Sequence, residues 1–295
     1  MFKMKTYLDC IPCFFRQALD MTRITGVDET TQKKVLNEVS KLIPDFPLDA
    51  SPPKMGREIY RIVKGITGKD DPFKKIKEKS NKLALDIYPK LKEEIRSSDD
   101  SLLTAIELAI AGNVIDYGVK NSLDIDKEIE KILARDFAGS GNGSNHNFDY
   151  QEFKDALNNA ESVLYLGDNA GEIVFDKLLI EELSNILPDT KITYVVRDKP
   201  VINDVLVEDA VSCGLDKIVD VISSGCDAPG TILDLCSKEF LKLYKNAELV
   251  ISKGQGNFET LADENREIFF LFKVKCPVIA NHTGFNLGDI VLKKI

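Results

Sequence analysis

The first half of the chain repeats its apolar residues at the spacing of amphipathic helices. Between residues 31 and 43, for example, Val35, Val39 and Leu42 fall on one face of a helix. Prolines near positions 52 and 72 suit the first turn of a helix, where no backbone N–H is needed. The pattern therefore predicts a helical first half, with helices over about 8–22, 31–43, 52–62, 71–95 and 102–117.

The second half alternates short apolar, β-branched runs with helical patterns. This alternation is typical of α/β proteins, in which helices cover both faces of a mostly parallel sheet. We therefore expect a helical N-terminal part followed by a Rossmann-like, mostly parallel sheet. The predicted strands are 162–166, 192–196, 217–221, 249–252 and 278–280.

A segment rich in Gly, Ser and Asn separates the two patterns at 138–147. Such composition marks a flexible connection, which can be a simple linker or a mobile lid over an active site. We place the domain boundary beside it. The prediction is a helical domain over 1–148 and an α/β domain over 149–295, the latter binding metal and phosphate.

Composition narrows the class of protein. The chain has 295 residues, 43% hydrophobic and 29% charged, as in soluble globular proteins. Its net charge of -9 argues against nucleic acid as a partner, because such binding needs a basic face. The apolar runs are too short to cross a membrane, and the N-terminus lacks a secretory signal. We expect a cytoplasmic protein with mostly reduced cysteines and leave its oligomeric state open.

Polar residues follow the first predicted strand at its carboxyl end, where ligands bind in parallel sheets. Asp168 and Asn169 lie between Gly167 and Gly171, which permit close approach of the backbone. Their oxygens suit a hard cation such as Mg²⁺ or Mn²⁺. The same residue types are also good helix caps. On this pair alone, either role is open.

Similar loops follow the next two strands. Asp204 comes after the second strand and can cap the next helix or supply a third oxygen to a metal. The loop 223–231 follows the third strand and contains Asp227. That loop can bind a ligand or form an ordinary Pro-Gly turn.

The fourth strand ends in Lys253, followed by the glycine-rich turn that contains Asn257. A lysine with glycine amides suits a phosphate, since the ammonium neutralises charge and the amides donate hydrogen bonds. The turn is not a Walker A loop, and the first strand lacks the dinucleotide fingerprint. Several polar loops at successive strand ends make a ligand site more probable than any one loop does.

Three of these segments together resemble the DUF89, or ARMT1-like, damage-control phosphatases. They are Gly-Asp-Asn-Ala-Gly-Glu at 167–172, Lys-Pro-Val-Ile-Asn-Asp at 199–204 and Lys-Gly-Gln-Gly-Asn-Phe-Glu at 253–259. The segment 111–116 and Cys10-Ile-Pro-Cys13 resemble the archaeal and prokaryotic branch. The resemblance covers nearly the whole chain. It implies metal ligands at Asp168, Asn169 and Asp204, and phosphate contact by Lys253.

The hypothesis that follows is a metal-dependent phosphatase acting on a small phosphorylated metabolite, such as a sugar phosphate or a damaged nucleotide. Mg²⁺, Mn²⁺, Co²⁺ or Ni²⁺ would activate the attacking water and polarise the phosphoryl group. The expected catalytic residues are Asp168, Asn169, Glu172 and Lys253. Glu172 is a candidate base, or else a first-turn acid that complements the helix dipole.

Further substrate contacts are expected from Asn257, Asp227, Asn113 and Asp116. Asn113 and Asp116 lie one helical turn apart, so they can reach the substrate together or form a buried polar pair. Cys10 and Cys13 are read as packed thiols, with redox sensing or a second metal site as alternatives.

Two other classes stay open on the residues alone. The first is a carboxyl methyltransferase dependent on S-adenosylmethionine, in which Asp198 would hold the cofactor ribose. Activity without any metal would favour it. The second is a non-catalytic sensor, which would bind a phosphorylated metabolite without releasing phosphate.

Overall fold

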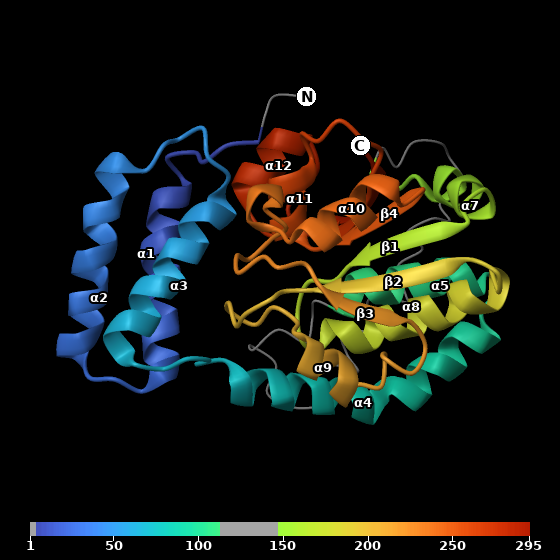
Figure 1. Cartoon of the computed structure of the whole chain (residues 1–295), viewed down its shortest axis with the longest axis horizontal. Helices are drawn as coiled ribbons and strands as arrows, with labels where there is room; N and C mark the ends of the chain where they lie inside the picture. The colour runs from blue at the N-terminus through green and yellow to red at the C-terminus, as the bar shows by residue number, and fades with distance from the viewer. Residues whose placement is uncertain (1–3, 113–146) are drawn as a thin grey trace.

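The computed structural model describes residues 4–112 and 147–295 (Figure 1). The described part of the first half is helical, as predicted, and the helices begin and end within a few residues of the expected positions. The predicted helix 102–117 is described only up to residue 112. The helices are α1 (Cys10–Thr25), α2 (Glu29–Leu42), the 3-10 turn Ile43–Asp45, α3 (Pro52–Thr67), α4 (Lys74–Ser97) and α5 (Ser101–Ala111).

The second half forms one six-stranded sheet in the order β3-β2-β1-β4-β5-β6. Its strands are β1 (Ser162–Leu166), β2 (Lys191–Val196), β3 (Asp220–Ser223), β4 (Leu249–Lys253), β5 (Phe269–Lys273) and β6 (Ile290–Lys294). Neighbouring strands run parallel except β5 and β6, which run antiparallel. The helices are α7 (Tyr150–Asn158), α8 (Glu172–Ile186), α9 (Val207–Ser212), α10 (Lys238–Asn246), α11 (Gln255–Leu261) and α12 (Pro277–Thr283), with a 3-10 turn at Leu233–Leu235. The mostly parallel α/β fold is confirmed.

Three strand predictions need correction. The run 278–280 is not a strand but part of α12, which begins at Pro277 and buries only Ile279. The fifth strand is instead β5, an apolar run buried on both faces, where period-two alternation is lost. The antiparallel strand β6 was not predicted. The third strand begins at Asp220 rather than Lys217, because the amides of Ile218 and Val219 donate to the Leu215 carbonyl and form a turn.

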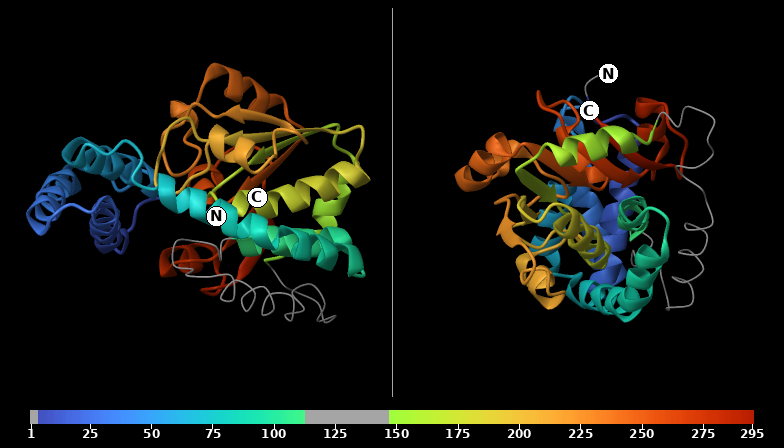
Figure 2. Two further views of the ribbon diagram at one scale, coloured as in Figure 1. Left: turned by 90° about the horizontal axis from the view of Figure 1, so that it is seen from below. Right: turned by 90° about the vertical axis from the view of Figure 1, so that its right-hand side faces the viewer.

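Side chains alternate between two cores along each strand. In β1, Val163 and Tyr165 belong to the core that α4, α5, α7, α8 and α9 cover, whereas Leu164 and Leu166 face α10, α11 and α12. Figures 1 and 2 show these helices as layers on the two sides of the sheet. None of the helices in residues 4–112 and 147–295 is long and apolar enough to span a bilayer.

The helices α1, α2 and α3 pack into a separate cluster that includes Phe14, Val39 and Ile59 (Figure 1). This cluster lies beyond the carboxyl ends of the strands and touches the α/β part through Val201. In contrast, α4 and α5 pack against α8 and share the core of the sheet. The domain boundary at residue 148 stays a prediction.

Candidate active site

The centre of the sheet provides a crevice between β1 and β4. The chain leaves β1 for α8 on one face of the sheet and leaves β4 for α11 on the other. Where neighbouring connections diverge in this way, parallel sheets bind their ligands. Gly254, with φ of 84°, brings the β4 loop against the end of β1. A Cβ atom on Gly254 would lie 2.1 Å from the carboxyl carbon of Asp168.

The three predicted metal ligands meet at this crevice. Asn169 forms an isolated antiparallel bridge with Asp204, although 35 positions separate them in the chain. The Ala170 amide donates to the Asn203 carbonyl at 2.9 Å, and the Val205 amide donates to the Asp168 carbonyl at 2.9 Å. Asp168, Asn169 and Asp204 are all buried. The backbone thus holds two carboxylates and one amide at one point.

The loop between β2 and α9 bends back and places Asp204 beside Asn169. Ile202, within this bend, has φ of 47°, a conformation that costs a β-branched residue on the order of 1–2 kcal/mol. Buried Arg197 compensates by joining the parts of the loop: its Nε donates to Asp204 Oδ2 at 2.8 Å. Its other nitrogens donate to Thr231 and Asn257. Arg197 therefore fixes the carboxylate from behind.

Burial disfavours the ionised form of these carboxyl groups and so raises their pKa values. It raises the pKa of Asp168 to about 7, and the nearby charge of Asp204 adds to the effect. It also raises the pKa of Asp204 to about 6, although Arg197 acts in the opposite direction. Two acids that resist ionisation side by side would be stabilised by a cation placed between them.

The donor set fits a hard divalent cation. Asp168, Asn169 and Asp204 offer only oxygen donors, which Mg²⁺ and Mn²⁺ prefer. Within residues 4–112 and 147–295, no group of three or more His, Cys, Asp or Glu side chains is arranged to hold a metal. The candidate set differs from such a group because its third ligand is the amide of Asn169. Its chemistry is that of a site completed by water or substrate oxygens.

Glu172 lies in the first turn of α8 and faces the same crevice. The Asn169 amide nitrogen donates to Glu172 Oε1 at 2.9 Å and to Asp168 Oδ2 at 2.8 Å. Burial raises the pKa of Glu172 to about 7, against the lowering effect of Lys253. A carboxyl group with such a pKa can exchange a proton near neutral pH.

Lys253 is buried beneath the crevice rather than exposed to it. Its Nζ donates to Asp176 Oδ1 at 2.5 Å and to the Ala109 carbonyl at 2.7 Å, and it lies 3.6 Å from Glu172 Oε2. Burial lowers the pKa of Lys253, but the neighbouring Asp176 and Glu172 outweigh it and give a net increase. The hydroxyls of Tyr165 and Tyr194 also donate to Asp176.

The other expected substrate contacts have different surroundings. Asn257 is buried and uses both ends of its amide, accepting from Arg197 and donating to the Lys253 and Gly167 carbonyls. Asp227 accepts two hydrogen bonds from Arg57 of α3, which ties the loop 223–231 to the helical cluster. Asn113 and Asp116 lie outside the described residues.

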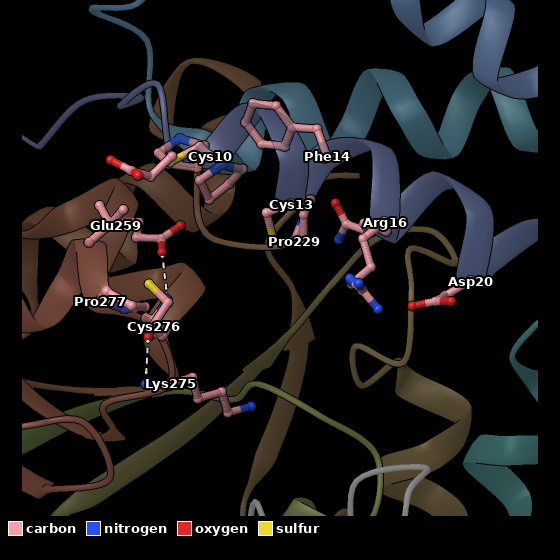
Figure 3. Close-up of a pocket in the computed structure, with 17 residues that line it drawn as sticks. Cys10, Cys13, Phe14, Arg16, Asp20, Pro229, Glu259, Lys275, Cys276 and Pro277 are labelled. Atoms are coloured by element: carbon pink, nitrogen blue, oxygen red, sulfur yellow. Dashed lines mark hydrogen bonds between the residues drawn. The ribbon is translucent and has the colours of Figure 1, made fainter.

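A pocket of about 710 Å³ opens beside the crevice, between α1 and α3 on one side and α11 and α12 on the other (Figure 3). Glu259 and Lys275 line it. The charge of Lys275 lowers the pKa of Asp168, whereas burial raises the pKa of Glu259 to about 7 and the charge of Asp168 adds to that effect. Cys10, Cys13 and Cys276 also line it as free thiols. Burial raises the pKa of Cys10 and of Cys13, so neither is an activated nucleophile.

Four residues of this region escaped the sequence reasoning: Asp176, Arg197, Glu259 and Lys275. Asp176 had a signal, because it lies one helical turn after Glu172 in an otherwise apolar stretch of α8. Arg197 also had one, since it directly follows a buried strand. Glu259 ends the segment 253–259 that resembles the family, although no role was assigned to it, and Lys275 carries no local pattern that separates it from other lysines.

Comparison with known proteins agrees with this architecture. Residues 6–291 match the family profile described as the damage-control phosphatase ARMT1-like domain. A damage-control phosphatase of Pyrococcus horikoshii is 33% identical, with 98% of this chain and 97% of that protein covered. One of Archaeoglobus fulgidus is also 33% identical, with 97% and 98% covered. An uncharacterized protein of Methanocaldococcus jannaschii is 37% identical, with 97% and 94% covered.

The fold agrees as well. The crystal structure of a DUF89 family protein from Pyrococcus horikoshii superposes with a TM-score of 0.88 at 33% identity, covering 99% of both chains. The protein is thus an α/β phosphatase. The chain belongs to the ARMT1-like damage-control phosphatase family.

Proposed function

We propose that this phosphatase uses one divalent cation, held by Asp168, Asn169 and Asp204, to hydrolyse a small phosphorylated metabolite. The proposal rests on the convergence of these three side chains at the crevice between β1 and β4. Each of the three presents a hard oxygen, which is the kind of ligand that such a cation prefers. Mg²⁺, Mn²⁺, Co²⁺ and Ni²⁺ are the candidates.

When bound, the cation supplies Lewis-acid polarisation of the phosphoryl group and a lowered pKa for water. The protein's own part is positioning. Arg197 holds Asp204 in place, and the Asn169 amide orients Asp168 and Glu172 through its two hydrogen bonds. Phosphoryl transfer depends mainly on such positioning and on fixed charge.

Glu172 is the proposed base. The Asn169 amide holds Glu172 in the crevice, and burial raises its pKa, so its carboxylate is positioned to accept a proton from the attacking water. Asn169 donates to Oε1, whereas Oε2 lies 3.6 Å from the Lys253 ammonium, beyond hydrogen-bond distance, so Oε2 is the atom we assign to the proton. The alternative role, complementing the dipole of α8, does not require this raised pKa.

Positive charge for the phosphoryl oxygens comes from two lysines in this proposal. Lys253 acts through its buried charge, because its Nζ is engaged with Asp176 and Ala109. Lys275 acts from the pocket wall, where its charge lowers the pKa of both Asp168 and Glu172. Lys275 is therefore the better candidate for direct contact with phosphate.

We further propose that the protein works in the cytoplasm and belongs to the archaeal and prokaryotic branch. The free thiols of Cys10 and Cys13 support both statements, because reduced cysteines fit a reducing compartment and the spacing resembles that branch.

A screen of phosphorylated metabolites tests the central proposal. The protein is stripped with EDTA and assayed for phosphate release, then reassayed with Mg²⁺, Mn²⁺, Co²⁺ and Ni²⁺ separately. We expect release only after a cation is restored. Equal turnover in the stripped protein, verified free of metal by elemental analysis, would sink the metal-dependent mechanism.

A further inference from the structure

We propose that the substrate carries a second anionic group, remote from the phosphate that is hydrolysed, and that Arg16 binds this group in the pocket beside Asp168. The inference rests on the proposed function and deepens it, since it describes the part of the substrate that does not react.

The pocket is larger than a phosphate needs. Its volume of about 710 Å³ falls in the range of sites that hold an organic ligand of some size. Pro229, Glu259 and Lys275 connect it to the crevice, whereas Arg16 and Asp20 mark its α1 side (Figure 3). A substrate whose phosphate lies near Lys275 would therefore extend its body toward α1.

Arg16 is an exposed cation whose guanidinium has no hydrogen bond or ion pair with any residue that the structure describes. Its neighbours differ: Arg23, on the same helix, pairs with Asp20, and Arg57 on α3 pairs with Asp227. In Figure 3 the Arg16 side chain extends from α1 into the space that Lys275 enters from the opposite wall. A guanidinium left open in this way suits a planar anion, which it can bind through two parallel hydrogen bonds.

Arg16 and Lys275 lie on opposite walls of the pocket (Figure 3). A phosphate held at Lys275 would leave Arg16 to act on the distal part of the bound molecule.

The remaining lining indicates what lies between the two anionic ends. Pro52, Pro53 and Pro277 provide rigid apolar surfaces, while Asp9 and Gln17 provide acceptors for hydroxyl groups. The substrate class is thus a hydroxylated phosphate ester with a second acidic group, either a carboxylate or another phosphate.

A matched pair of compounds tests this assignment. Sorbitol 6-phosphate and 6-phosphogluconate share a six-carbon chain and a phosphate, and differ in the group at the other end. Their inhibition constants against hydrolysis of p-nitrophenyl phosphate are measured for the metal-loaded wild type, Arg16→Gln and Arg23→Gln. Arg23 is a control on the same helix that does not line the pocket.

We expect the wild type to bind 6-phosphogluconate at least about 10-fold more tightly than sorbitol 6-phosphate, the size of one charge-assisted hydrogen bond. Arg16→Gln should reduce this ratio to about 1, whereas Arg23→Gln should keep it. A wild-type ratio near 1, or an unchanged ratio in Arg16→Gln, overturns the inference.

Failure of the proposed function would look different. The wild type would then not hydrolyse p-nitrophenyl phosphate with any cation. In that case calorimetry would still measure the affinity of the pocket for the same two compounds. A preference for 6-phosphogluconate that depends on Arg16 would then support the inference without the catalytic proposal, and its absence would overturn both.

Discussion

Two clusters of buried charge lie side by side under the same strand ends, and they are completed in different ways. Around Asp176, the chain supplies every partner: Lys253 and the hydroxyls of Tyr165 and Tyr194 all bond its carboxylate. Around Asp168 and Asp204, Arg197 bonds Asp204, and within residues 4–112 and 147–295 no ion pair joins a cationic side chain to Asp168. The first cluster is balanced by the chain's own side chains, whereas the second has two carboxyl groups whose raised pKa values a bound cation would offset.

This difference shows how a buried charge acquires a role. Breaking a complete pair leaves an uncompensated charge in the interior, so the effect should appear in folding. Removing an acid from an incomplete cluster relieves repulsion, so the effect should appear in binding and catalysis. The predictions below separate these two outcomes.

The largest expected effect on stability comes from Asp176→Asn. The change removes the closer of the two carboxylates beside the buried Lys253 ammonium and leaves only Glu172, at 3.6 Å, among the described acids paired with it. The free energy of unfolding should therefore fall by about 3 kcal/mol. Urea unfolding measures the loss. Asp86→Asn, which breaks an exposed pair with Lys82, is the control and should cost less than about 0.5 kcal/mol. A similar loss in both variants would show that Asp176 has no special role in support.

Gly254→Ala tests the close approach of the β4 loop to the Asp168 carboxyl group. The added methyl group would overlap the Asp168 carboxyl group and displace it, so kcat/KM should fall by about 100-fold. Gly288→Ala is a matched control, because Gly288 also has positive φ, 90°, but has open space around it. Backbone strain should cost each variant about 1–3 kcal/mol of stability, and the overlap with Asp168 should add to the loss in Gly254→Ala. Unchanged activity in Gly254→Ala would contradict the close approach.

The smallest effect is expected at a charge pair that is neither buried nor catalytic in this account. Burial opposes ionisation of Asp227, but the hydrogen bond and charge of Arg57 outweigh it and lower its pKa. Because the folded-state pKa lies below the unfolded value, the pair stabilises at neutral pH and loses this contribution as acid protonates Asp227. Asp227→Asn should cost about 1 kcal/mol or less at neutral pH.

Stability curves of the two proteins against pH provide the measurement. The curves should converge as the pH falls through the folded-state pKa, below about 4. A constant difference down to the most acidic point would mean that Asp227 acts through something other than its charge.

The sequence could predict the parts of the site that carry a local signal. Asp168 and Asn169 directly follow a buried strand, and the periodicity placed that strand at 162–166, as the structure has it. The position of Asp204 after the second strand left two roles open, a helix cap or a third metal ligand, because its return to Asn169 depends on the bend at Ile202 and on Arg197. The family resemblance favoured the metal ligand.

The fold shows the same limit. The strand β5 consists of aromatic and apolar residues buried on both faces, so neither alternation nor helical spacing distinguishes it. The edge strand β6 is defined by its antiparallel pairing with β5, which is a contact between distant segments. The position of α1 over the crevice, which makes Arg16 part of the pocket, is likewise a result of tertiary packing.

Metal binding by Asp168 tests the central claim most directly. Mn²⁺ is titrated calorimetrically into stripped wild type and Asp168→Asn, and both are assayed for phosphate release from p-nitrophenyl phosphate. We predict one saturable site in the wild type, and in the variant at least about 100-fold weaker binding with phosphate release lost in parallel. The stripped proteins should unfold with free energies within about 1 kcal/mol of each other, because an unpaired buried acid is removed. Wild-type affinity and turnover in Asp168→Asn would contradict the account.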